Sequence, residues 1–259
     1  MFVLLLTQVA CTGGPPSTAD SAGADTGLVP VHGGDPAGFP RVKTLLFGKA
    51  TTTMDLSTGT SEDAPPSLAV LSVQSSTWLP LLSADNADGC WRRDAIELGG
   101  KLADLGDQLT VSVGGTDIFL PDSGRVYEAI LKGDDAVAAT TAGAAVRLEG
   151  QDTTFVVPEA IVVDDLAGSA EALATDTLLH LRWTPSELPG FVEVQAIDHT
   201  DSGLWCALED DGSADIDLGE VAQTAEHLSI GHVARGTFEH ATLGNTFVDL
   251  ERTITVALP

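Results

Sequence analysis

Three cysteines are the side chains of this chain with the widest covalent chemistry: Cys11, Cys90 and Cys206. Cys90 and Cys206 could pair in an oxidising compartment and close a long loop. The alternative is a pair of buried free thiols, because Cys206 lies on the apolar face of an expected strand. Their spacing does not decide between the two, and the absence of a C-x-x-C motif argues against a zinc site.

Carboxylates crowd the turns of the second half of the chain. Calcium prefers such oxygen-rich loops, and the candidate ligands are Asp198, Asp201, Asp210 and Asp211. A solvated acidic rim is the plainer interpretation and the one we favour. The acidic run 84–89 fails the spacing of an EF-hand, because the required acidic positions hold Ala84 and Ala95. We therefore predict no metal site, with calcium as the weaker alternative.

Three histidines, His227, His232 and His240, could bind a metal together with Glu226 or Glu239. Ligands on one face of a strand lie two residues apart. His227 and His232 differ by five positions, so they face opposite ways on a straight strand. Exposed or structurally satisfied histidines are the better interpretation.

Catalytic and nucleotide-binding motifs are missing from the sequence. Ser123 and Ser202 each lie in an Asp-Ser-Gly triplet where a turn is expected, and no G-x-S-x-G elbow occurs. The chain also lacks the glycine-rich loops that bind nucleotide phosphates. We predict that it is not an enzyme and needs no cofactor. A hydrolase whose residues converge only in three dimensions is a third, weaker hypothesis.

The charge balance limits the partners. Twelve Lys and Arg stand against 38 Asp and Glu, a formal net charge of −26. Nucleic acid would be repelled, because binding it requires cations that neutralise phosphates. The surface carboxylates favour solubility, and cations or basic proteins are the charged partners that fit.

The N-terminal sequence MFVLLLTQVAC places an apolar run and a small residue directly before Cys11. It resembles the lipobox of bacterial surface lipoproteins. The resemblance implies that residues 1–11 are a lipoprotein signal peptide with its lipobox cysteine, and that Cys11 carries the lipid. It also implies a location at the bacterial outer membrane or cell surface, or on the periplasmic side. The apolar run is too short for a transmembrane helix, which needs about 20 apolar residues.

Residues 12–40 are rich in Gly, Pro, Ser, Ala and Asp and show no periodicity. Such a composition buries too little apolar surface to offset its ordering entropy, so we expect a disordered, flexible linker. As a random coil it would span on the order of 30 Å and hold the acidic body away from the membrane.

The alternation of apolar and polar residues predicts β-strands in the rest of the chain. In the first half, alternating apolar residues at 109–113 and a Gly114-Gly115 pair indicate a β-hairpin over residues 107–121. Further expected strands cover 41–50, 68–73, 126–131, 145–148 and 154–157, with a loop at 51–66 and a helical turn allowed within 136–145.

The second half shows period-two patterns at 179–183, 192–196 and 204–208. Expected strands at 228–234, 237–238, 247–250 and 253–258 bring this half to about seven strands, the count of an immunoglobulin-like sandwich. The prediction is an all-β protein with two β-sandwich (immunoglobulin-like) domains, at residues 41–157 and 158–259.

These patterns together predict a lipid-anchored, acidic cell-envelope protein with a structural or binding role and no catalytic activity. Its partners would be the membrane, through the lipid, and an unknown protein or glycan. The alternative is a calcium-assisted adhesive or carbohydrate-binding module.

Overall fold

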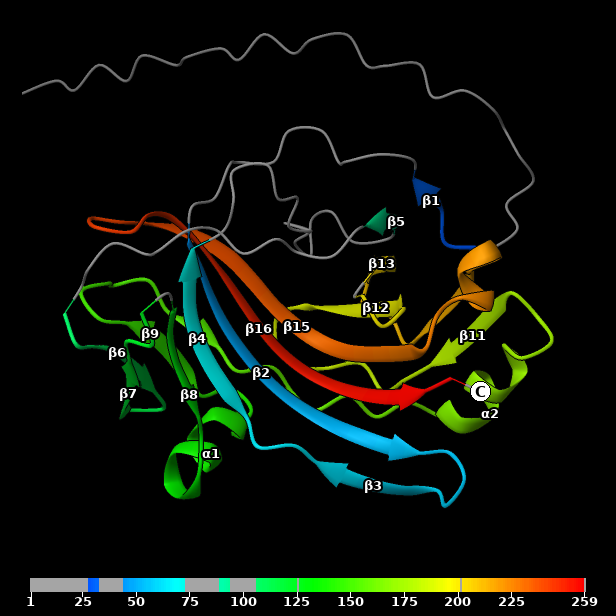
Figure 1. The fold of residues 1–259 in the computed structure, drawn as a ribbon, viewed down its shortest axis with the longest axis horizontal. Helices are drawn as coiled ribbons and strands as arrows, with labels where there is room; N and C mark the ends of the chain where they lie inside the picture. The colour runs from blue at the N-terminus through cyan, green and yellow to red at the C-terminus, as the bar shows by residue number, and fades with distance from the viewer. Residues whose placement is uncertain are drawn as a thin grey trace, which may run out of the picture.

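The computed structural model describes residues 28–32, 44–72, 89–93, 106–124, 126–200 and 202–258. Cys11, Asp201, most of the acidic run 84–89 and nearly all of the linker lie outside these residues. The described chain is built mostly of β-strands, which confirms the all-β prediction (Figure 1). No described helix has the length and apolar character needed to cross a membrane.

One ten-stranded sheet dominates the molecule, in the order β1-β5-β13-β12-β15-β16-β2-β4-β8, with β3 paired to β2. Most neighbours are antiparallel, but β16 pairs with β2, and β1 with β5, in parallel. The strands of this sheet are β1 (Val31–His32), β2 (Thr44–Asp55), β3 (Thr60–Asp63), β4 (Ser67–Ser72), β5 (Gly89–Arg93), β8 (Val126–Ile130), β12 (Phe191–Ile197), β13 (Gly203–Leu208), β15 (His227–His240) and β16 (Gly244–Ala257).

Two smaller sheets and the helices complete the described fold. A four-stranded sheet has the order β10-β9-β6-β7, and a two-stranded sheet pairs β11 with β14. Figure 1 places the β6, β7, β9 group with α1 at one end of the main sheet, and β11 with α2 at the other. Their bounds are β6 (Gln108–Val113), β7 (Thr116–Pro121), α1 (Gly133–Thr140), β9 (Ala145–Leu148), β10 (Phe155–Val156), α2 (Leu166–Ala172), β11 (Leu178–Arg182), β14 (Ser213–Asp217) and the 3-10 helix η2 (Gly219–Gln223).

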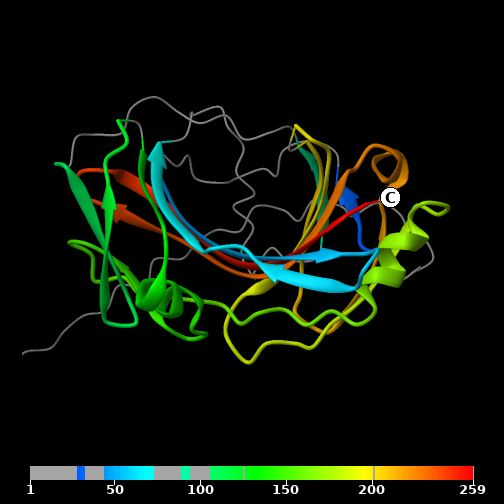
Figure 2. The same cartoon turned by 60° about the horizontal axis from the view of Figure 1, so that its bottom comes forward.

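Strand register gives the main sheet two chemically different faces. We call them the even face and the odd face, after the residue numbers that point to each from β2, β4, β5, β12, β13, β15 and β16. The even face is apolar at both ends and carries two hydrophobic cores. One core packs it against the four-stranded sheet, and the other against β11, β14 and α2. These layers make the sandwich, and Figure 2 shows the curved main sheet running between the two ends.

Strand pairing does not follow the boundary expected between residues 157 and 158. The main sheet takes β2, β4, β5 and β8 from before that boundary, and β12, β13, β15 and β16 from after it. The two expected halves correspond broadly to the two cores, but they share one sheet rather than forming two separate immunoglobulin-like sheet pairs. Alternation in a sequence tells which side chains are buried, and it does not identify the neighbouring strand.

Two predicted strand pairs are single long strands in the structure. Residues 228–234 and 237–238 both belong to β15, and 247–250 and 253–258 both belong to β16, each strand having 14 residues. The expected loop at 51–66 is also wrong in part, since β2 continues to Asp55 and β3 forms an exposed edge at Thr60–Asp63. Polar residues inside these strands hid their continuity.

The β-hairpin predicted from the Gly114-Gly115 pair is present as β6 and β7. Gly114 and Gly115 both have positive φ, of 60° and 87°, in the two-residue turn between paired strands. Glycine takes this left-handed conformation without steric cost, and its twist matches the flanking strands. Residues 145–148 form β9 as predicted, and the helical turn allowed within 136–145 is part of α1.

Candidate functional site

A groove of about 350 Å³ lies on the even face, between the two regions covered by the smaller layers. Its floor comes from the middle of β2 and β16, at residues 50–52 and 252–254. Its walls come from residues 63–66, from α1 at 136–140 and from residues 160–161. Segments far apart in the sequence therefore meet here because β2 and β16 are neighbouring parallel strands.

Arg252 is the cation of this groove. Its Nη1 donates a hydrogen bond of 2.6 Å to the carbonyl oxygen of Thr140, the last residue of α1. The final carbonyls of a helix lack intrahelical partners and carry partial negative charge, so a cation here satisfies and stabilises the end of α1. Burial lowers the pKa of Arg252, and the nearby carboxylate of Asp63 opposes that shift.

Asp63 is the groove's anion, at the end of the edge strand β3. Its Oδ1 accepts a hydrogen bond of 2.7 Å from the hydroxyl of Thr52. Asp63 influences the pKa of Arg252, yet the two side chains form no ion pair within 4.0 Å. Opposite charges thus line one groove without neutralising each other directly.

The rest of the described lining is small and mostly apolar. Ala50, Ala64, Ala136, Val137 and Ile161 contribute to it, and none of the described lining residues is aromatic. Such a surface can pack against short aliphatic groups of a ligand.

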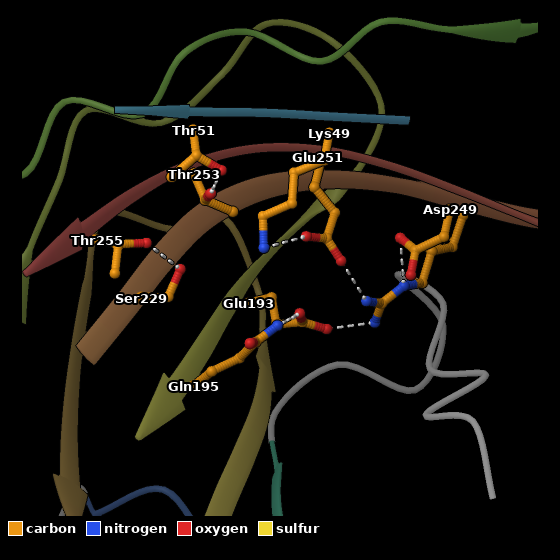
Figure 3. Close-up of polar contacts among 10 residues, drawn as sticks. Lys49, Thr51, Glu193, Gln195, Ser229, Asp249, Glu251, Thr253 and Thr255 are labelled. Carbon is orange, nitrogen blue, oxygen red and sulfur yellow. Dashed lines mark hydrogen bonds and ion pairs between the residues drawn. The ribbon is translucent and has the colours of Figure 1, made fainter. Parts of the chain in front are cut away.

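The odd face of the main sheet carries a buried ion cluster centred on Arg235 of β15, with carboxylates from β12 and β16. The Arg235 side chain is 1% exposed and contacts three carboxylates, shown in Figure 3: Nη1 lies 2.5 Å from Glu193, Nε 2.9 Å from Asp249 and Nη2 3.4 Å from Glu251. The guanidinium also lies 5.2 Å from the ring centre of Phe191, a cation–π distance.

Charges in the cluster do not balance when all groups are ionised. Lys49 adds a second cation, 3.6 Å from Glu251, against three carboxylates. Burial, reinforced by Asp249, raises the pKa of Glu251 to about 8, and burial also raises the pKa of Asp249. Burial opposes ionisation of Arg235 too, but the carboxylates outweigh it and raise the pKa of Arg235. Retention of one proton by the carboxylates would restore neutrality.

Further polar side chains, with hydroxyl and amide groups, lie beside the ion cluster on the odd face (Figure 3). Thr51 and Thr253 lie 3.1 Å apart through their hydroxyls, and Thr255 donates to Ser229 at 3.0 Å. Gln195 donates to Glu193. Buried polar groups are tolerated when they are bonded to one another in this way. The cluster is therefore a structural element of the sheet, with its guanidinium enclosed by carboxylates.

The calcium candidates do not form one site. Asp198 accepts three hydrogen bonds from Thr200 and Ser202 in the turn between β12 and β13, which lowers its pKa chiefly through the Thr200 hydroxyl. Asp210 and Asp211 follow the opposite end of β13, about 20 Å away at 3.3 Å per strand residue. In the part of the chain that the structure describes, no three His, Cys, Asp or Glu side chains are grouped to hold a metal ion.

Asp210 has a structural set of partners. Its Oδ1 accepts from the indole of Trp183 at 2.7 Å, and its Oδ2 accepts from the backbone N–H of Ser186 at 2.8 Å. Buried His232 places Nε2 3.4 Å from Oδ2, within ion-pair distance but without hydrogen-bond geometry. Asp211 accepts from the backbone N–H of Ser213.

The three histidines of β15 do not converge on a common ligand. His227 is exposed, His232 is buried on the even face, and His240 lies at the end of the strand. His240 accepts from two backbone N–H groups of the turn that follows. His227 and His232 point to opposite faces of the sheet, as their spacing predicts.

Cys90 and Cys206 form a disulfide in the structure. They lie directly opposite each other on the paired strands β5 and β13. The bond closes a loop with a sequence separation of 116 residues. It joins two strands from opposite sides of the expected domain boundary.

Comparisons with known proteins find no matching family model and no matching curated protein. Among solved structures, a candidate carbohydrate-binding protein from Bacteroides uniformis shares 12% identity over 82% of this chain and 99% of its own, at a TM-score of 0.22. A bacterial ice-binding adhesin of 1.5 MDa has 12% identity over 82% of this chain and 66% of its own, at a TM-score of 0.18. A calcium-stabilised adhesin of an Antarctic bacterium has 14% identity over 80% and 49%, also at 0.18.

These similarities are too low to carry an argument about function. By its own sequence and structure, the protein is an acidic all-β sandwich with a small charged groove on one face of its main sheet. Arg252 and Asp63 were not among the candidate residues predicted from the sequence. A detectable signal was the run of charged residues 249, 251 and 252 inside an alternating strand pattern.

Proposed function

We propose that this chain is a non-enzymatic binding protein of the bacterial cell envelope, and that it holds a small ligand in the groove around Arg252. The observation that carries the proposal is the groove itself, whose volume of about 350 Å³ is in the range of small-molecule sites. A few polar groups among apolar walls are typical of such sites, and Arg252 with Asp63 supplies them here.

Binding fits the groove better than catalysis does. Nucleophilic catalysis needs a nucleophile activated by a neighbouring base. The described lining includes four threonines, and no histidine lies among the described lining residues to activate them. Thr52 donates to Asp63, Thr140 donates to the Ala136 carbonyl, and the hydroxyls of Thr51 and Thr253 bond to each other. His232 and Asp210 pack together away from the groove lining. The hydrolase hypothesis therefore gains no support from the described residues.

The proposal also includes the membrane tether. A lipid on Cys11, followed by the spacer, would leave the acidic body free to meet its ligand at the envelope. Intact-mass measurement of protein from membranes should show acylation at Cys11, and Cys11→Ala should release the protein into the soluble fraction. An unacylated wild-type protein would remove the tether and leave the groove proposal standing.

Groove binding can be tested without knowing the ligand. Thermal melting of the full chain would be followed with amino acids, short peptides, fatty acids, and sugars with and without calcium chloride. One class should raise Tm, and Ala64→Trp, which places a bulky ring on the exposed wall, should abolish that rise. Lack of any shift, or a shift unchanged in Ala64→Trp, would contradict the proposal.

The calcium-assisted adhesive or carbohydrate-binding alternative predicts a different pattern in the same experiment. A sugar would raise Tm only when calcium is present, and Ala64→Trp would leave the shift unchanged. Asp211→Asn would then be the informative variant, because Asp211 lies in an acidic turn and accepts one hydrogen bond there, from the backbone N–H of Ser213.

A further inference from the structure

The two charges of the groove lie close together, yet a direct ion pair is not formed. Asp63 stabilises the charged form of Arg252, but their side chains remain more than 4.0 Å apart. Arg252 carries five N–H donors, and Thr140 receives the one hydrogen bond that this guanidinium makes among the described residues. A guanidinium with unused donors is well suited to a carboxylate, since it can bind it with two parallel hydrogen bonds.

Asp63 offers the complementary half. Its Oδ1 already accepts from Thr52, and a carboxylate has acceptor capacity for further donors such as an ammonium group. The groove therefore presents a cation and an anion side by side, which favours a ligand carrying both opposite charges.

The lining between and around these charges selects the body of the ligand. Alanines 50, 64, 136 and 160 leave room for backbone and short aliphatic side chains. The described lining has no aromatic ring on which a sugar ring could stack. The net charge of −26 disfavours anionic ligands at long range, whereas a neutral zwitterion is not repelled.

We propose that the groove binds a short zwitterionic peptide with small apolar side chains, of dipeptide or tripeptide size. Its terminal carboxylate lies on the guanidinium of Arg252, and its terminal ammonium lies on the carboxylate of Asp63. This inference rests on the proposed function and names the ligand class of that site. The volume of the groove is near the lower end for small-molecule sites, which fits so short a peptide.

Calorimetric titration of the full chain with Ala-Ala tests the inference. N-acetyl-Ala-Ala lacks the ammonium and Ala-Ala amide lacks the terminal carboxylate, so each should bind the wild type about tenfold more weakly. In Asp63→Asn, acetylation should cause no further loss. In Arg252→Gln, amidation should cause no further loss. This pairing of ligand and protein changes assigns each charge to its partner.

Matched controls separate these charges from the general field of the protein. Arg182→Gln and Asp117→Asn change exposed residues on β11 and β7 and should leave the affinity within about twofold. Arg252→Lys keeps the positive charge at the end of α1. It is the variant to use in place of Arg252→Gln if the neutral side chain disturbs that helix. Circular dichroism would report folding of each variant.

Several outcomes would overturn the inference. They are no binding of Ala-Ala or Ala-Ala-Ala, equal binding of the blocked peptides, or binding that survives Ala64→Trp. If a sugar or fatty acid binds instead and Ala64→Trp abolishes it, the peptide inference fails while the proposed groove function stands. If no ligand class binds the groove, both fail.

Discussion

Arg235 and Arg252 lie on the neighbouring strands β15 and β16 but point to opposite faces of the main sheet. Arg235 is almost fully buried, and three carboxylates surround its guanidinium. Arg252 is half-buried, and among the described residues its guanidinium donates to a single backbone carbonyl. The same kind of side chain thus serves structure where carboxylates surround it, and can serve recognition where a single carbonyl accepts from it.

The sharpest test of this contrast is removal of each arginine. Arg235→Met would leave three buried carboxylates without their main cation, and we expect it to lower the free energy of unfolding by about 3–5 kcal/mol. Urea denaturation measures the change. Arg252→Met is the matched variant and should cost far less. Equal losses would contradict the distinction between the two arginines.

Loss of the disulfide should have the next largest effect. Replacing both Cys90 and Cys206 by serine should cost about 2–5 kcal/mol, because the bond closes a long loop in the unfolded chain. The bond lies on β5 and β13, several strands away from the groove floor on β2 and β16. Ligand affinity of the folded variant should therefore be unchanged, and a changed affinity would show that the groove depends on that edge of the sheet.

The buried cluster should also make stability depend on pH. An unfolded Glu251 releases its proton near pH 4.5, whereas the folded protein holds it to a pKa of about 8. Folding therefore takes up a proton between these values, and the free energy of unfolding should fall as pH rises through this window, by up to about 1.4 kcal/mol per pH unit.

Urea denaturation at several pH values between 5 and 8 measures that slope. Glu251→Gln, which keeps the shape without the ionisable group, should flatten it, while the exposed Glu128→Gln on β8 should not. A slope that persists in Glu251→Gln would assign it to another group, and Asp249 would be next, since its pKa is raised in the same direction.

The smallest effect is expected for the stability of Arg252→Gln. It loses one charged hydrogen bond to Thr140 at a half-exposed site, so we expect a loss of about 1 kcal/mol or less. Circular dichroism melting would show it as a small decrease in Tm. A loss as large as that of Arg235→Met would mean that Arg252 mainly holds α1 in place.

Much of the strand content could be predicted from alternation and turn residues. The β6–β7 hairpin follows from its Gly-Gly turn, and β13 from the alternation at 204–208. Charged residues at the centre of the sheet obscure the continuity of its two longest strands. Arg235, Glu251 and Arg252 interrupt the apolar pattern, so β15 and β16 were each divided in two. These residues mark no strand end: Arg235 and Glu251 belong to the buried ion cluster, and Arg252 belongs to the groove.

The candidate site could not be found in the same way. Its floor forms where β16 pairs in parallel with β2, and its walls come from the distant residues 63–66, 136–140 and 160–161. Nothing in the local sequence specifies that pairing, since period-two alternation fixes the face of a residue and leaves its neighbour open. The groove is a product of tertiary topology.

The hairpin of β15 and β16 has a consequence for how the molecule can be divided. Each of these two strands contributes side chains to both hydrophobic cores, to one core near one end of the strand and to the other core near the opposite end. Cutting the gene at the expected boundary would leave the N-terminal fragment without β16, the parallel neighbour of β2. The C-terminal fragment would keep an uncovered apolar surface. The two ends should therefore melt in one cooperative transition, and neither fragment should be recovered in native form when expressed alone.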